Sequence, residues 1–222
     1  MRCVSTRSVK LFNYWRSSSS YRVRLALHFK ALPFEYIAVH LAKGEQHQSA
    51  HLERNPLHTV PLLEVEEGGH TIHIPQSVAI VEYLEERYPE KPLFPKDLSA
   101  RAAMRALVEQ INSGIQPFHN LSTLKYVKDT LHSDEKQFAG NFLHAGLDQL
   151  EALARRTAGT FMVGDQFTWA DACLLPQLYG ARRFSVSETN YPLLARIEAR
   201  ALALDFVQLA IPERQIDAQP TS

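Results

Sequence analysis

The spacing of apolar residues changes near residue 90 and divides the chain into two parts. In the first part, short apolar and β-branched runs predict strands at residues 9–14, 34–40, 60–65 and 71–74. Residues 21–31 and 77–88 repeat apolar positions at the helical period, which predicts two helices, and the polar stretch 43–54 predicts an irregular one. Gly68 and Gly69 favour a hairpin turn between the last two strands. The first part is therefore expected to form a small α/β unit.

The second part shows helical periodicity only. Three prolines at residues 89, 92 and 95 interrupt any helix or central strand and indicate an extended linker. Apolar positions at helical spacing follow over residues 98–127, 134–156 and 191–209. Between them Thr168 and Asp171 have the spacing of a capping box at the start of another helix. We predict an α/β domain over residues 8–89, a linker over 90–97 and an all-helical domain over 98–222.

The charge balance narrows the classes of partner. The chain has 222 residues, of which 45% are hydrophobic and 22% charged, as is usual for a globular protein. Its 24 basic and 24 acidic residues give a formal net charge of zero, so no basic field favours nucleic acid or an anionic membrane. No apolar run approaches the roughly 20 residues that a membrane span needs. The composition therefore gives no reason to expect nucleic acid or a membrane as the partner.

Cysteine and histidine usage changes the picture little. The two cysteines, Cys3 and Cys173, lie far apart in the sequence and do not indicate a disulfide framework. Residues 1–10 lack the apolar core of a signal peptide. We therefore expect a cytoplasmic protein, with Cys173 packed in the core. The chain has ten histidines, but those at residues 40, 47, 51 and 58 lack a firm metal-ligand pattern with cysteine or carboxylate, so we assign no metal.

A run of four serines, Ser17 to Ser20, lies between the first predicted strand and the first predicted helix. Such a run is typical of a flexible loop with a good helix cap. It also suits an anion site, because a strand-to-helix turn points free amides and the positive end of a helix dipole at one place. Hydroxyls at that place would stabilise a thiolate. The turn has no cysteine, so a cofactor would have to supply the sulfur.

Two prolines mark further candidate binding segments. Val60 precedes Pro61 at the start of a strand, which is either an ordinary edge feature or a cis-proline that turns the Val60 backbone toward a peptide-like ligand. Gln76 and Ser77 follow Pro75 at a helix start, where they serve either as a cap or as a carboxylate site. Together with the serines, these segments suggest a groove for a short, acidic, sulfur-bearing peptide.

Longer motifs resemble one known family. They are Arg16-Ser17-Ser18-Ser19-Ser20-Tyr21-Arg22-Val23-Arg24, Asn55-Pro56 with Val60-Pro61, Gln76-Ser77, Gly114-Ile115-Gln116-Pro117 with Asn120-Leu121-Ser122, Gly164-Asp165 with Ala170-Asp171, Arg183-Phe184 and the tail Pro212-Glu213-Arg214-Gln215. Over residues 9–218 the chain is similar to zeta-class glutathione transferases, the maleylacetoacetate isomerase family. The resemblance implies a thioredoxin-like N-terminal domain, an all-helical C-terminal domain, a homodimer and glutathione as cofactor.

The resemblance also implies a set of site residues. Ser17, Ser18 and Ser19 would be catalytic, with Ser18 the first candidate to hold the thiolate. Arg16 and Arg183 would bind the carboxylates of the substrate, a task that suits guanidinium groups. Gln46 would meet the glycine carboxylate of glutathione, with Gln48 as an alternative. The full set implied to bind glutathione is Ser17, Ser18, Ser19, Ser20, Tyr21, Arg22, Gln46, Val60, Gln76, Ser77, Gln116, Asn120, Leu121 and Ser122. By pattern alone, Arg22 and Arg24 would belong to a solvated helix face.

The implied reaction is the glutathione-dependent cis–trans isomerisation of maleylacetoacetate to fumarylacetoacetate in tyrosine and phenylalanine breakdown, by reversible thiolate addition. Ser19 stands where the family usually has cysteine. Relatives that act on maleylpyruvate also lack that cysteine, so a maleylpyruvate isomerase is a close alternative. Transfer of glutathione to small α-halo acids is another alternative, and a non-catalytic glutathione-fold binding protein is a remote one.

Overall fold

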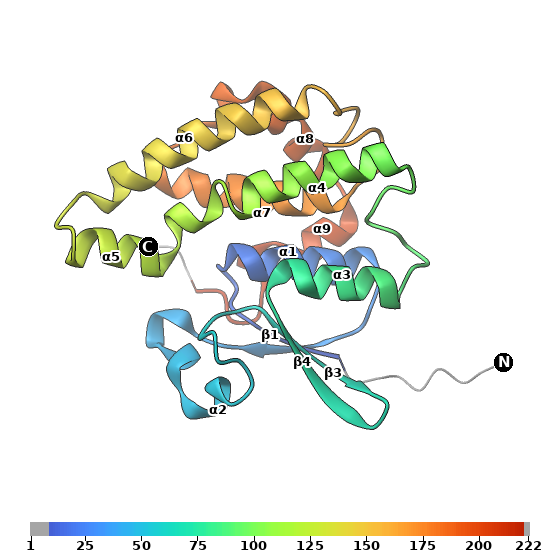
Figure 1. Ribbon diagram of the computed structural model, residues 1–222, viewed down its shortest axis with the longest axis vertical. Coiled ribbons are helices and arrows are strands. Elements are labelled where there is room, and N and C mark those ends of the chain that lie inside the picture. The colour runs from blue at the N-terminus through green and yellow to red at the C-terminus, as the bar shows by residue number, and fades with distance from the viewer. Residues whose placement is uncertain (1–8, 220–222) are drawn as a thin grey trace. The chain divides into compact units, whose positions relative to one another are not determined.

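The computed structural model describes residues 9–219 (Figure 1). By its contacts this part of the chain divides into two units, residues 9–92 with 205–219, and residues 93–204. Cys3 and residue 8, where the predicted first domain begins, lie outside the described residues, as do residues 220–222.

The first unit is built on a sheet of four strands. These are β1 (Val9–Asn13), β2 (Glu35–Ala38), β3 (Leu62–Glu67) and β4 (His70–Pro75), in the order β2-β1-β3-β4. β2 runs parallel to β1, whereas β3 is antiparallel to both β1 and β4. Gly68 and Gly69 both have positive φ, as a tight hairpin turn requires, so the predicted hairpin is confirmed.

Helices cover the sheet of the first unit. α1 (Ser18–Phe29) and α3 (Ser77–Arg87) lie side by side on one face, and the short α2 (Ser49–Leu52) lies on the other (Figure 1). Leucines from the strands and from α1 are fully buried, namely Leu11 of β1, Leu63 of β3 and Leu25 of α1. The predicted thioredoxin-like α/β unit is confirmed.

The second unit is helical. Its helices are α4 (Leu98–Asn112), α5 (Leu121–Asp129), α6 (Glu135–Ala154), α7 (Trp169–Ala181) and α8 (Pro192–Leu202). α7 is buried over nearly its whole length and contacts α4 and α8. Cys173 is buried in α7, so its predicted place in the core is confirmed.

Two predicted helices are broken in the structure. The single helix expected over residues 98–127 ends at Asn112, and a 3-10 turn at Gln116–His119 separates it from α5. Pro117 in that turn has no N–H to donate, which disfavours a continuous helix, although α7 does continue through Pro176. The helix expected over residues 191–209 is likewise divided into α8 and α9 (Asp205–Ala210).

The end of the chain belongs to the first unit, which corrects the predicted boundary of the helical domain at 98–222. Residues 205–219 group with residues 9–92 rather than with the other helices. α9 contacts α1, and the rings of Phe29 and Phe206 meet edge to face at 5.3 Å between centroids. Helical periodicity therefore identified the element, but it did not show which unit the element joins.

Within residues 9–219, no helix combines the length and apolar character that a membrane crossing requires.

Candidate active site

Three chain segments meet at one edge of the sheet in the first unit. Phe12, near the end of β1, pairs with Leu62 at the start of β3, and Leu62 pairs with Pro75 at the end of β4. The serine turn follows β1, Val60 precedes β3, and Gln76 follows β4. Strand register alone therefore gathers the three segments that the sequence singled out.

The serine turn begins α1. Ser17 is the N-cap, and its Oγ accepts a hydrogen bond from the Ser20 N–H at 3.2 Å. Helix geometry leaves the first-turn N–H groups of Ser18 and Ser19 without an intrahelical acceptor. Ser18 and Ser19 are half-buried, whereas the Oγ of Ser20 is fully buried and has no partner among the described residues. The turn therefore presents both amides and hydroxyls at the positive end of a helix dipole.

A second helix start lies at the same edge. Gln76 is the N-cap of α3 and has a φ of 71°, a region that costs energy for a residue with a side chain. The following Ser77 is buried, and its Oγ lies 3.5 Å from Nη1 of Arg22, a donor on α1. Backbone strain at such a place is typical of a binding site.

Val60 lies beside these helix starts. The Val60–Pro61 bond is cis, one of the two alternatives that the sequence left open. Val60 precedes the first paired residue of β3, Leu62, so its own N–H and C=O fall outside the ladder. Its side chain packs with Phe12, Val39 and Leu62. The backbone of Val60 is therefore free to pair with an extended ligand.

Gln46 lies in the segment that follows β2. It belongs to a 3-10 turn at Glu45–His47, and its Oε1 is buried with no hydrogen-bond partner among the described residues. Because β2 runs parallel to β1, its chain leaves the sheet at the edge where β1 ends. Gln48, the alternative, is exposed and is the N-cap of α2.

Arg22 and Arg24 are not on a solvated helix face, which corrects the expectation drawn from the pattern alone. Both side chains are fully buried. Arg24 donates to Asn13 Oδ1 at 3.1 Å and to the Trp15 carbonyl at 2.9 Å. Arg16 is only half-buried, but its Nε is buried without a partner among the described residues, and its guanidinium lies 5.6 Å from the Trp15 ring centroid.

The predicted residues of the second unit also gather. Gln116 Nε2 donates to Asn120 Oδ1, and Asn120 is the N-cap of α5. Leu121 and Ser122, in the first turn of α5, are exposed. The segment therefore carries a free helix start, like the segments in the first unit.

Arg183 is exposed in a 3-10 turn at Arg182–Phe184, with its guanidinium 5.8 Å from the Phe184 ring centroid. The Phe184 ring meets His119, next to the Gln116 segment, at 5.9 Å between centroids. The neighbouring Arg182 instead forms a bidentate ion pair with Glu198, at 3.0 and 2.5 Å, which is a structural role.

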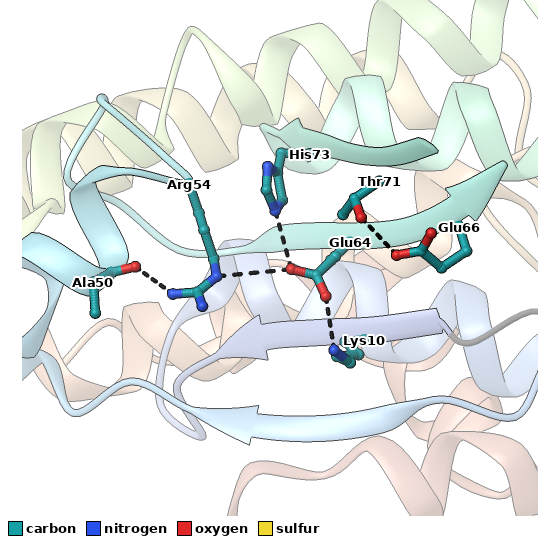
Figure 2. Close-up of polar contacts among 7 residues, drawn as sticks. All are labelled: Lys10, Ala50, Arg54, Glu64, Glu66, Thr71 and His73. Carbon is teal, nitrogen blue, oxygen red and sulfur yellow. Dashed lines mark hydrogen bonds and ion pairs between the residues drawn. The ribbon is translucent and has the colours of Figure 1, made fainter. Parts of the chain in front are cut away.

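The charged groups on the sheet form a separate, saturated cluster (Figure 2). Glu64 accepts from Lys10 at 2.8 Å and from His73 at 3.0 Å, and Arg54 lies 3.7 Å away. Burial opposes ionisation of Glu64, but the hydrogen bonds and charges of Lys10 and His73 outweigh it and lower the pKa of the carboxyl. A carboxylate held in this way has no proton to give, so we assign it no catalytic role. Among the described residues no group of three metal-ligating side chains gathers.

Comparison with known proteins shows the family. Residues 7–86 match the model for the N-terminal domain of glutathione S-transferase, and residues 142–200 match the model for its C-terminal domain. The chain is 41% identical over 215 residues to maleylacetoacetate isomerase of Dictyostelium discoideum, covering 95% of this chain and 96% of that protein. It belongs to the zeta-class glutathione transferase family.

Two further relatives are similar to this zeta-class transferase over nearly its whole length. Maleylpyruvate isomerase of a Ralstonia species is 40% identical, with coverage of 95% of this chain and all of that protein. Maleylacetoacetate isomerase of Anaeromyxobacter dehalogenans is 47% identical, with a TM-score of 0.90 over 96% of this chain and 99% of the other, in a crystal structure with bound glutathione in the active site.

The sequence missed the contacts that hold the serine turn of this transferase in place. They come from Arg24, which was expected on the surface, and from Asp217, which no motif singled out. The resemblance of the tail at residues 212–215 was the one signal that pointed toward this end of the chain.

Proposed function

We propose that this protein is a glutathione-dependent isomerase that converts maleylacetoacetate to fumarylacetoacetate. The observation that carries the proposal is the strand register that gathers two helix starts and the Val60 backbone at one edge of the sheet. Relatives named maleylacetoacetate isomerase, at about 40% identity over nearly the whole chain, support the same reaction.

The residues at this edge fit glutathione. Its carboxylates need N–H and hydroxyl donors, and its peptide backbone needs a free strand edge. Ser77 and Gln76 suit the γ-glutamyl carboxylate, Val60 suits the cysteinyl backbone, and Gln46 suits the glycine carboxylate. The buried unpartnered atoms of Ser20 and Gln46 support a ligand here, because buried polar atoms in native proteins normally have partners. Ser17, Ser18, Ser19, Ser20, Tyr21 and Arg22 complete the proposed set in this unit, and Gln116, Asn120, Leu121 and Ser122 form the proposed set in the second unit.

When bound, glutathione supplies a thiolate that adds reversibly to the cis double bond and leaves after the bond has turned. The chain must keep the sulfur ionised, and the first turn of α1 suits this task because its amides and its dipole favour an anion. Ser18 is the proposed hydroxyl donor. Ser17 and Ser19 assist, although the Ser17 oxygen already serves as the helix cap.

Arg16 and Arg183 are the proposed partners of the substrate carboxylates. A guanidinium binds a carboxylate through two parallel hydrogen bonds, which gives orientation as well as affinity. The relative from Anaeromyxobacter dehalogenans has also been crystallised with bound dicarboxyethyl glutathione and citrate in its active site. That ligand joins glutathione to a unit with two carboxyl groups, which supports a dicarboxylate substrate for this chain.

We further propose that the protein is a cytoplasmic homodimer that acts in tyrosine and phenylalanine breakdown. The reducing cytoplasm keeps glutathione as the free thiol, which the reaction needs. The homodimer rests on the resemblance to the family, and size-exclusion chromatography with light scattering tests it.

Maleylpyruvate isomerisation is the second candidate function, and two observations favour it. By the resemblance, Ser19 stands where the family usually has cysteine, and a maleylpyruvate isomerase matches 95% of this chain at 40% identity. Conjugation of small α-halo acids would use the same glutathione site.

One assay separates these candidates. The pure protein is incubated with maleylacetoacetate or with maleylpyruvate, with and without glutathione, and the trans product is followed. We expect glutathione-dependent isomerisation, faster with maleylacetoacetate. If neither compound is isomerised, the proposed function is wrong, and turnover of α-halo acids would then identify a transferase.

Arg183→Ala tests the substrate site. We expect the KM for the diacid to rise about tenfold or more, because a charged hydrogen bond contributes about 1.5–3 kcal/mol. Conjugation of an uncharged electrophile should stay nearly unchanged, and it serves as the control. An unchanged KM for the diacid would remove Arg183 from the site.

A further inference from the structure

The geometry points to Asp217 as a positioning residue, whose carboxylate fixes the backbone at Trp15 and thereby holds the turn that carries Arg16 and the serines. Asp217 lies in the tail that packs on the first unit, 202 positions from Trp15 in the sequence. The catalytic part of this inference rests on the proposed function, whereas the clamp itself is tested without it.

Both oxygens of the Asp217 carboxylate have a partner. Oδ2 accepts from the Trp15 backbone N–H at 3.1 Å, and Oδ1 accepts from the hydroxyl of Tyr36 at 2.5 Å. Tyr36 lies in the middle of β2, paired with Leu11 of β1, so the carboxylate is held against the sheet. The tail is therefore attached by a charged acceptor rather than by apolar contact alone.

Arg24 holds the other side of Trp15. Its Nη2 donates to the Trp15 carbonyl at 2.9 Å, and its Nε donates to the Ala210 carbonyl at 3.2 Å. The guanidinium is fully buried, and the Trp15 residue is only 2% exposed. The N–H and the C=O of Trp15 are thus both fixed, one by the tail carboxylate and the other by a cation that also binds the tail.

The fixed residue is well placed to set the geometry of the site. The turn closes through a 3.0 Å hydrogen bond from the Ser17 N–H to the Tyr14 carbonyl, so Trp15 and Arg16 are its central residues. A rotation at Trp15 would move the Arg16 side chain and the cap that starts α1. Catalytic groups need positions held within about half an ångström, and such support usually comes from buried neighbours.

The Tyr36 hydroxyl remains a donor to this carboxylate across the working pH range. Burial, and next the hydrogen bond to Asp217, raise the pKa of Tyr36, while the nearby Arg24 charge opposes the rise. Tyr36 therefore keeps the proton that it donates to the carboxylate at neutral pH.

Asp217→Ala tests the clamp because it removes both carboxylate acceptors, whereas an asparagine could still accept from the Trp15 N–H and donate to the Tyr36 hydroxyl. We expect hydrogen exchange of the Trp15 amide, measured by NMR, to rise about 10- to 100-fold, the loss expected for a hydrogen bond to a charged group. Gln219→Ala is the matched control: it lies two residues further along the same tail, bonded to His40, and should leave Trp15 exchange unchanged. If Trp15 exchange in folded Asp217→Ala equals wild type, the clamp is refuted.

The positioning role has its own readout. We expect kcat of Asp217→Ala to fall about tenfold or more, with a smaller change in the KM for glutathione and a raised pKa of the bound thiol, followed by its ultraviolet absorbance. Faster exchange at Trp15 with unchanged kcat and thiol pKa would reduce Asp217 to a structural contact and overturn the positioning role. If wild type neither binds glutathione nor isomerises the diacids, the proposed function fails, while the exchange measurement still decides the clamp.

Tyr36→Phe covers the case in which Asp217→Ala does not fold. This variant removes one donor to the carboxylate and leaves the Trp15 contact in place. We expect a rise in Trp15 exchange smaller than that of Asp217→Ala, and no change at all would overturn the part of the clamp that runs through Tyr36.

Discussion

The helices α1 and α7 both begin with hydroxyl-bearing residues, but the two helix starts have different roles. At α7 the cap is closed: the carboxylate of Asp171 accepts from the Thr168 N–H at 2.8 Å, from the Thr168 hydroxyl at 2.9 Å and from the Met162 N–H at 2.8 Å. At α1 only the Ser20 N–H has a side-chain cap, and the amides of Ser18 and Ser19 remain without an intrahelical acceptor. A helix start that satisfies itself is structural, and one that leaves donors open can bind an anion.

The largest expected effect comes from a substitution at the start of α1, where the amides of Ser18 and Ser19 lack an intrahelical acceptor. Ser18→Ala should lower kcat about 10²- to 10³-fold, because one donor to a developing charge is typically worth about 3–4 kcal/mol. The Kd for glutathione, measured by calorimetry, should change far less. Ser99→Ala, an exposed serine in the first turn of α4, is the matched control and should leave both unchanged. Equal losses of turnover and binding would show that Ser18 only positions the tripeptide.

Substitutions at the satisfied cap of α7 should lower the stability of the protein rather than its catalytic rate. Asp171→Ala leaves buried donors of Thr168 and Met162 without an acceptor, and we expect a loss of about 2–4 kcal/mol in the free energy of unfolding. Denaturant titration measures it. Asp97→Ala at the exposed cap of α4, where Asp97 accepts from the Ala100 N–H at 2.8 Å, should cost only about 1 kcal/mol. Similar costs at the two caps would contradict the distinction between a buried and an exposed cap.

Burial of the closed cap also makes stability depend on pH. Burial raises the pKa of Asp171 to about 6, although the hydrogen bonds from Met162 and Thr168 oppose the rise. The folded state then binds the proton more tightly than the unfolded state, so this group's contribution to stability is greatest below about pH 4. It declines, by up to about 3 kcal/mol, as the pH rises to about 6. Unfolding of wild type and Asp171→Asn from pH 4 to 7 checks this, and a constant difference between them would refute it.

The smallest expected effect concerns the one first-turn amide of α1 that has a side-chain cap, the N–H of Ser20. Ser17→Ala removes the cap on the Ser20 N–H and should cost about 1 kcal/mol of stability. Ser17→Asn retains an acceptor and should keep the stability of wild type in thermal unfolding. If both variants are equally destabilised, Ser17 is not acting as a helix cap.

Much of the fold and part of the site could be predicted from neighbours along the chain. The hairpin at Gly68-Gly69 and the capping box at Thr168 depend on residues within a few positions of one another, and both are present. The break of the long helix after Asn112 was only partly within reach, because the missing N–H of Pro117 disfavours a helix without forbidding one, as Pro176 within α7 shows. The roles of the serines, Gln76 and Val60 remain predictions, although their segments do meet at one sheet edge.

By itself the sequence determined the order of strands and helices, the two structural classes and the serine-rich helix start, because periodicity and capping act over one or two turns. Only the tertiary structure decided that Arg22 and Arg24 are buried, that residues 205–219 join the first unit, and that Asp217 meets Trp15. The physical reason is distance along the chain. A guanidinium on an amphipathic helix has the same local pattern whether it faces water or four carbonyl and amide acceptors. Three of the acceptors of Arg24 lie 9 to 11 residues away and the fourth 186 residues away, all beyond the one or two turns over which periodicity acts.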